Sequence, residues 1–103
     1  LQQEQLKGRR YRGDIKVVDV KSEKTNGRAF AVIESENYYG NGRSVAMEFR
    51  TSDFDKAAQI KVNDRLSVVG TLSYFRTQRS GYMNVPDKLF ASFIDVTIED
   101  IKK

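Results

Sequence analysis

The chain has 103 residues, a length that fits one small domain with one hydrophobic core. It contains no cysteine and no histidine, which excludes disulfides, thiol nucleophiles, His-based triads and the usual zinc sites. Lysine and arginine number 18 against 14 acidic residues, so the net charge is +4 and an anionic partner such as nucleic acid is favoured.

The N-terminal part predicts an arm followed by a strand. Residues 1–8 are polar and carry no strand pattern, so we expect a flexible arm, then one folded domain over residues 9–99 and a C-terminal end over 100–103. A basic run that includes Arg12 is either a solvated edge or a phosphate-contacting arm. The first strand, which contains Lys16, is expected over residues 13–20, with a bulge near Val17 and Val18 where the apolar residues change parity.

Two further strands follow. Residues 21–27 are expected to form a polar loop that ends in Asn-Gly, a strong hairpin signal. The second strand, residues 28–35, is apolar on both parities, so Phe30 fits either the core or a binding face. Residues 36–43 are expected to form a hairpin tip, where aromatic side chains suggest binding. The third strand, residues 43–50, places Val45, Met47 and Phe49 in the core and Arg50 on the opposite face as a ligand contact.

The hydrophobic period then changes to that of a helix. Ser52 and Asp55 have the spacing of a capping box. Phe54, Ala57 and Ala58 follow at helical spacing, and Ile60 extends the apolar set. We therefore expect one helix of about two turns. Its apolar side, including Phe54, is expected to plug a barrel, and the alternative for Phe54 is a stacking residue.

The fourth strand, residues 62–76, alternates with period two. Its pattern groups Tyr74 with Leu66, Val68 and Leu72, so that core packing and binding are equally supported for Tyr74, whereas Phe75 falls on the polar face. Gly70 in mid-strand indicates a bend or a bulge. A hairpin with its turn at residues 80–81 and a last strand over residues 89–98 follow, and three phenylalanines are assigned to the core: Phe49, Phe90 and Phe93.

The order strand, strand, strand, helix, strand, strand is that of the OB-fold, an all-β, five-stranded Greek-key barrel. An SH3-like barrel, which does not need the helix, and an unclassified α+β sheet are the alternatives.

Three runs resemble the single-stranded DNA-binding proteins of bacteria and their phages. Residues 31–38 resemble the family's second strand, which ends in an aromatic that stacks on a base. Residues 54–59 are similar to the family's Phe-Gly-Lys-Leu-Ala-Glu, whose leading phenylalanine also contacts the bound DNA strand. Residues 62–72 resemble Lys-Gly-Asp-x-Val-x-Val-x-Gly-x-Leu. The resemblance implies an OB-fold that binds single-stranded DNA as a dimer or tetramer.

The chain also departs from that family. Its first strand ends in Val18-Asp19-Val20 instead of Gly-Arg-Leu, and it contains no tryptophan and no acidic tail. We therefore expect a phage or mobile-element member, or a trimmed form, that protects single strands during replication or recombination and contacts proteins of those processes. The lack of cysteine fits the cytoplasm, that of the host if a phage encodes the chain. No apolar run reaches the roughly 18 residues of a membrane-spanning helix, so no membrane partner is expected.

A general single-strand binder needs flat side chains that stack on bases and cations that contact phosphates. An RNA-binding OB domain would use the same residue types, and a protein-binding OB module is the alternative of another class. Catalysis is the least supported reading, since Asp53 and Asp55 fit helix caps, and no cofactor or metal is expected. The candidate nucleic-acid contacts are Arg12, Lys16, Arg28, Phe30, Tyr38, Tyr39, Arg43, Arg50, Phe54, Tyr74, Phe75, Arg76, Arg79 and Tyr82.

Overall fold

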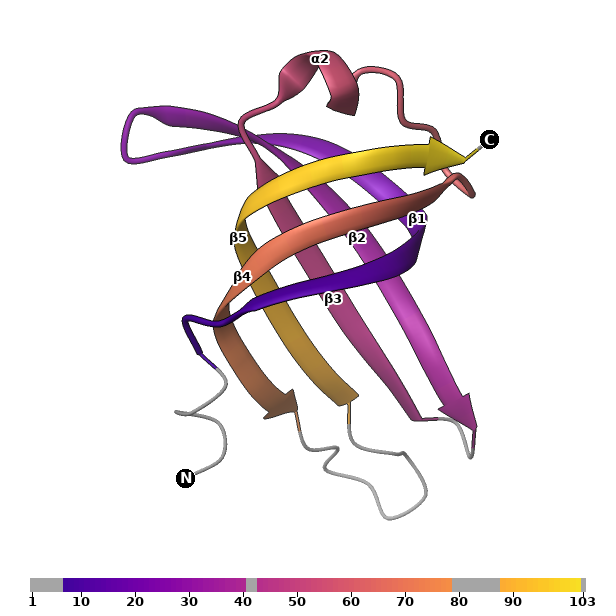
Figure 1. Ribbon diagram of the computed structural model, residues 1–103. Coiled ribbons are helices and arrows are strands. Elements are labelled where there is room, and N and C mark those ends of the chain that lie inside the picture. Colours follow the sequence, from indigo (N-terminus) through magenta and orange to yellow (C-terminus); the bar gives the residue numbers. More distant parts are fainter. Residues whose placement is uncertain (1–6, 41–42, 79–87, 103) are drawn as a thin grey trace.

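A computed structural model describes residues 7–40, 43–78 and 88–102. Over these residues the strands close into one barrel with the neighbour order β1-β2-β3-β5-β4 (Figure 1). The expected all-β, five-stranded OB-like barrel with a helix between the third and fourth strands is confirmed. None of the described helical residues forms a segment long and apolar enough to cross a bilayer. The elements are β1 (Arg10–Thr25), β2 (Arg28–Gly40), β3 (Arg43–Thr51), α2 (Phe54–Ala57), β4 (Arg65–Gln78) and β5 (Lys88–Lys102).

Strand β1 is long and curved because it serves two neighbours. Its first part, residues 10–16, pairs with β4, and its second part, from Val17 onward, pairs with β2. A register shift between Val17 and Asp19 marks the change of partner and confirms the expected bulge. At this point Ser35 Oγ donates a hydrogen bond of 2.7 Å to the carbonyl oxygen of Lys16, which fastens β2 to the bulge.

The hairpins differ from expectation in length. Residues 21–25 belong to β1 and not to a loop, because they pair with residues 28–32 of β2. Asn26 and Gly27 alone make the turn, with φ values of 53° and 79°, as the Asn-Gly pair indicates. Residues 36–40 are likewise strand and not a hairpin tip, since they pair with the first residues of β3. Long pairing lets the strands extend past the closed part of the barrel (Figure 1).

The core lies inside the barrel and follows the period-two pattern of the sequence. Val45 and Phe49 of β3 are buried and Met47 is partly buried, as expected. Phe93 of β5 stacks on Phe49 with ring centroids 4.8 Å apart and also belongs to this interior. The main cluster of buried hydrophobic residues contains Ile15, Val17, Ile33, Phe49, Ile60, Leu66, Val68, Val96 and Ile98.

Helix α2 is shorter than expected and differs in its cap. Asp53, not Ser52, is the N-cap, and its side chain accepts a hydrogen bond from the Lys56 amide. Ala57 and Ile60 are buried, but Phe54 is 44 % exposed. The assignment of Phe54 to the core was wrong, since a helix of only one turn covers the barrel opening with a single small residue (Figure 1).

Candidate nucleic-acid interface

Tyr74 points outward because β4 contains a bulge. Leu72 pairs with Phe93 in the interior, and the next paired residue of β4 is Tyr74, opposite Ser92, so that Ser73 is an extra residue. The extra residue reverses the parity of everything that follows. Tyr74 is therefore 44 % exposed, whereas Phe75 is partly buried and pairs with the buried Ala91. The expected placement of Phe75 on the polar face was wrong.

Tyr74, Phe90 and Arg76 form a group that we call the aromatic–arginine cluster. The Tyr74 and Phe90 rings meet edge to face, with centroids 6.3 Å apart. The guanidinium carbon of Arg76 lies 6.0 Å from the Tyr74 centroid and 5.4 Å from the Phe90 centroid. Such cation–π contacts hold the cation near the rings and contribute about 0.5–1 kcal/mol at exposed sites. The cluster thus presents a ring for stacking beside an exposed positive charge.

The sequence reasoning assigned Phe90 to the core, and this was wrong. Phe90 pairs with Ala46 of β3 and Arg76 of β4, both on the outer face, while Phe93 faces the interior. Two residues three apart in a regular strand take opposite faces. That parity could have separated Phe90 from Phe93 without a structure.

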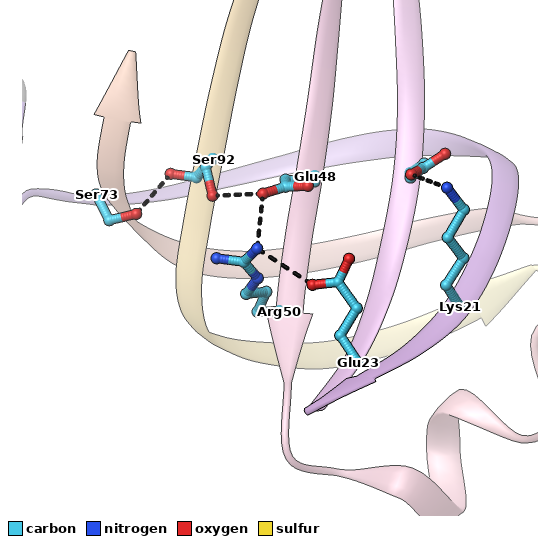
Figure 2. A network of polar contacts seen from close by, with 7 residues as sticks. Lys21, Glu23, Glu48, Arg50, Ser73 and Ser92 are labelled. Carbon is cyan, nitrogen blue, oxygen red and sulfur yellow. Dashed lines mark hydrogen bonds and ion pairs between the residues drawn. The ribbon is translucent and has the colours of Figure 1, made fainter. Parts of the chain in front are cut away.

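On the outer face of β3 and its neighbouring strands, carboxylates form a network of ion pairs and hydrogen bonds (Figure 2). Arg50 Nη2 lies 3.3 Å from a carboxylate oxygen of Glu23 and 3.3 Å from one of Glu48. Glu48 also accepts a hydrogen bond of 3.0 Å from Ser92 Oγ, and Ser73 Oγ donates to the carbonyl oxygen of Ser92 at 3.2 Å. The positive charge of Arg50, a candidate contact, is therefore compensated by carboxylates of the protein itself.

The same half of the face carries a further ion pair. Lys21 Nζ lies 3.0 Å from a carboxylate oxygen of Glu34, and this hydrogen bond and the charge attraction raise the pKa of Lys21 above its ordinary value. Glu36, the next outward residue of β2, pairs with Ala46. The outer face is thus divided: β2 and β3 hold the carboxylates, and β4 and β5 hold the aromatic–arginine cluster. Phosphates are repelled by the first half and attracted by the second.

The other candidate contacts are not brought together. Arg12 makes a two-pronged ion pair with Glu99, with distances of 2.9 and 3.1 Å. Arg28 is exposed beside the β1–β2 turn. Phe30 is partly buried opposite Glu23, and Phe54 begins α2, at the other end of the barrel from the end of β4 (Figure 1).

Several candidates lie beyond what can be described. Tyr38 and Tyr39 belong to the end of β2 and Arg43 to the start of β3, but their side chains lie outside the described part of the molecule. Arg79 and Tyr82 lie outside the described residues altogether. The exposed Lys16 belongs to β1, on a different part of the surface.

No protein-family model and no curated protein matches the chain. Among solved structures, the barrel is similar to the crystal structure of a putative nucleic acid-binding lipoprotein from Klebsiella pneumoniae subsp. pneumoniae, with a TM-score of 0.63 and 7 % sequence identity. The likeness covers 94 % of this chain and 75 % of the lipoprotein chain. At this identity the likeness shows a shared fold. The resemblance to single-stranded DNA-binding proteins remains a prediction from the sequence.

Proposed function

We propose that this protein binds nucleic acid, and specifically single-stranded DNA without sequence preference. The aromatic–arginine cluster carries the proposal, because it sets an exposed ring beside a cation that forms no ion pair with a described residue, on a barrel surface. OB-folds bind oligonucleotides with the face of strands 2 and 3 and with the loops between strands 1 and 2 and between strands 4 and 5. The cluster lies on the two strands that flank the second of these loops. The description of the Klebsiella lipoprotein as nucleic acid-binding supports the general class.

Stacking supplies affinity without sequence readout. Every base has a flat face, and a stacked base contributes about 1–3 kcal/mol by alanine substitution. A duplex hides those faces, so the cluster selects single strands. Arg76 adds a phosphate contact next to the stacked base, since a guanidinium can bridge phosphate oxygens. The carboxylates of β2 and β3 restrict the bound DNA to the β4–β5 half of the outer face.

The first test is a titration with oligo-dT, the matching oligo-U and a duplex at two salt concentrations. The chain contains five tyrosines and no tryptophan, so stacking is read as quenching of tyrosine fluorescence. We expect tight, salt-sensitive quenching by dT, weaker quenching by U and none by duplex. Equal binding of U and dT would assign the protein to RNA as well, and binding of none of the three at low salt would refute the proposal.

The second test places the site with two matched variants. Tyr74→Ala should weaken binding of a labelled oligo-dT by about 5- to 150-fold, the equivalent of one stacked base. Phe54→Ala removes a ring with the same exposed fraction of 44 % at the other end of the barrel, and we expect little change. Arg76→Gln should lower the log–log salt slope by about 0.7. If Phe54→Ala weakens binding and Tyr74→Ala does not, the site is elsewhere.

The remaining expectations from the sequence stay predictions. They are a homo-oligomer in the cytoplasm, encoded by a phage or mobile element, that acts in replication or recombination. We propose a binding role and no catalysis.

A further inference from the structure

Three cations lie side by side at the other end of β4, and we call them the cationic row. Lys16 of β1 pairs with Arg65 of β4, and Arg65 pairs with Lys102 of β5. All three are exposed. Since neighbouring strands lie about 4.8 Å apart, the row spans about 10 Å. Like charges directly opposite each other destabilise a sheet, so the row has an electrostatic cost that a bound anion would relieve.

The cationic row has no direct ion pair within the described part of the chain. None of its three members makes an ion pair with a described carboxylate. The nearest carboxylates along the strands, Asp14 and Asp100, belong to the next row of the sheet, where both pair with Ser67. Asp14 is held there by a hydrogen bond of 2.6 Å from Ser67 Oγ.

A hollow beside the row offers room for a ligand group. It has a volume of about 250 Å³ and is lined by Asp14, Ile15, Lys16, Asn37 and Arg65. The two cations at its wall and the Asn37 side chain give it donors for an anion, while Asp14 faces its partner Ser67.

A further cation lies between the row and the aromatic–arginine cluster. Arg10 Nη1 donates to Thr71 Oγ1 at 2.9 Å and to the carbonyl oxygen of Asp95 at 3.2 Å. Both acceptors are neutral, so these two hydrogen bonds do not compensate the positive charge of Arg10. Thr71 lies on the outer face of β4 between Arg65 and Tyr74. The cationic row, Arg10 and the cluster therefore follow one another along a single strand.

We propose that the outer face of β4 is a track for the phosphate backbone of a single strand. It runs from the aromatic–arginine cluster past Arg10 to the cationic row, and the carboxylates of Asp14 and Asp100 flank it at Ser67. Arg65 and Tyr74 are nine positions apart, which corresponds to about 30 Å along the strand. The inference rests on the proposed function and adds the path of the ligand. A short oligonucleotide would occupy the cluster alone, and a longer one would reach the row.

The test compares two triple variants that each remove three positive charges. The row variant replaces Lys16, Arg65 and Lys102 by Gln. The control variant replaces Lys24, Lys56 and Lys61 by Gln, three exposed cations outside the track that are not among the candidate contacts. Each protein is titrated with oligo-dT of about 4 and about 16 nucleotides, the span of site sizes per OB-fold, over a range of salt concentrations. Thermal melting checks folding, and the row variant should melt at the same or a higher temperature.

We expect the row variant to bind the short oligonucleotide like the parent. With the long oligonucleotide, the slope of log affinity against log salt concentration should be about 2 shallower than that of the parent, since three phosphate contacts contribute about 0.7 each. Between about 50 and about 200 mM salt, the parent should lose roughly 20-fold more affinity for the long oligonucleotide than the row variant does. Arg65→Gln alone should lower the slope by about 0.7. The control variant should keep the slope of the parent.

Other results would overturn the track in distinguishable ways. Equal effects of the two triple variants would mean that only net charge matters. If Tyr74→Ala weakens binding of the short oligonucleotide and the row variant leaves the long one unchanged, the proposed function stands and the track fails. If the parent binds neither oligonucleotide, the proposed function fails as well. If the row variant loses binding to phosphatidylglycerol–phosphatidylcholine vesicles but not to dT, the row serves a membrane surface.

Discussion

Replacing Gly70 by Ala tests how closely β4 and β5 approach each other. Gly70 is buried on the inner side of β4. An added Cβ would lie 2.9 Å from Val96 Cγ2 and 3.2 Å from Phe93 Cβ, with the carbonyl oxygen of Ile94 at 3.7 Å. The first distance is shorter than packed carbon atoms accept, so either the Val96 side chain or β5 must shift. Overpacking of this kind costs about 1–3 kcal/mol.

The expected loss of stability follows from two opposing contributions. Ala restricts the unfolded chain and returns about 0.4–1 kcal/mol, so the net loss in free energy of unfolding is about 1–2 kcal/mol. For a domain of this size that corresponds to a fall in Tm of about 5–15 °C, since 1 kcal/mol shifts Tm by about 4–8 °C.

Gly13→Ala is the matched control in the assay. Gly13 also lies in a strand, but an added Cβ there meets no atom within 4 Å and its φ is not positive. Thermal unfolding followed by circular dichroism should show a lower Tm for Gly70→Ala and an unchanged or slightly higher one for Gly13→Ala. Equal melting temperatures for both variants would refute the clash.

A double-mutant cycle identifies the clashing atom. Val96→Ala removes the Cγ2 that the new Cβ would meet and, by itself, destabilises the core, because Val96 is buried. If the clash with Val96 dominates, Gly70→Ala should cost less in the Val96→Ala background, with a coupling energy of about 0.5–3 kcal/mol. Additive effects of the two substitutions would indicate that the new Cβ clashes with Phe93 and not with Val96.

Three further predictions concern polar contacts. Ser35→Ala should cost about 1–3 kcal/mol of unfolding free energy in urea, because it leaves the carbonyl oxygen of Lys16 without its 2.7 Å donor; an unchanged urea midpoint would show that water replaces the hydroxyl. Asp53→Ala should cost about 1 kcal/mol through loss of the α2 cap, and a neutral result would mean that the helix is held by packing alone. Because Glu34 raises the pKa of Lys21 above its ordinary 10.5, the stability that this pair contributes should be complete at neutral pH and be lost as the pH rises through the raised pKa; Glu34→Gln should bring the pKa of Lys21 down in an NMR titration, and no change would refute the pairing.

The barrel could be predicted because local patterns determine it. The alternation of Leu66, Val68 and Leu72 specifies the inner side of β4, Asn26–Gly27 specifies a turn, and the parity change at Val17 specifies a bulge. Each of these signals involves residues that are neighbours in the chain, so the sequence carries them directly.

The candidate site could be predicted only in part, because two of its features depend on distant residues. The bulge at Ser73 arises from the pairing of β4 with β5 and leaves no mark in the period-two pattern, so Tyr74 and Phe75 were assigned to the wrong faces. Arg50 has the appearance of a free cation until β1 brings Glu23 within 3.3 Å of it. A residue type in a strand indicates a possible role, but its partners across the sheet decide whether the charge or the ring is available.

The bulge and the carboxylate network together account for where a ligand can bind. If β4 continued as a regular strand without the bulge at Ser73, Tyr74 and Arg76 would share the parity of Leu72, and both would face the interior. Ser73 also donates to Ser92, whose hydroxyl holds Glu48 against Arg50. The residue that turns the ring outward is therefore hydrogen-bonded to the chain of contacts that pairs Glu48 with Arg50. A side chain of Arg50 engaged in this way cannot compete with Arg76 for phosphate, which leaves the β4–β5 half as the cationic surface next to an exposed ring.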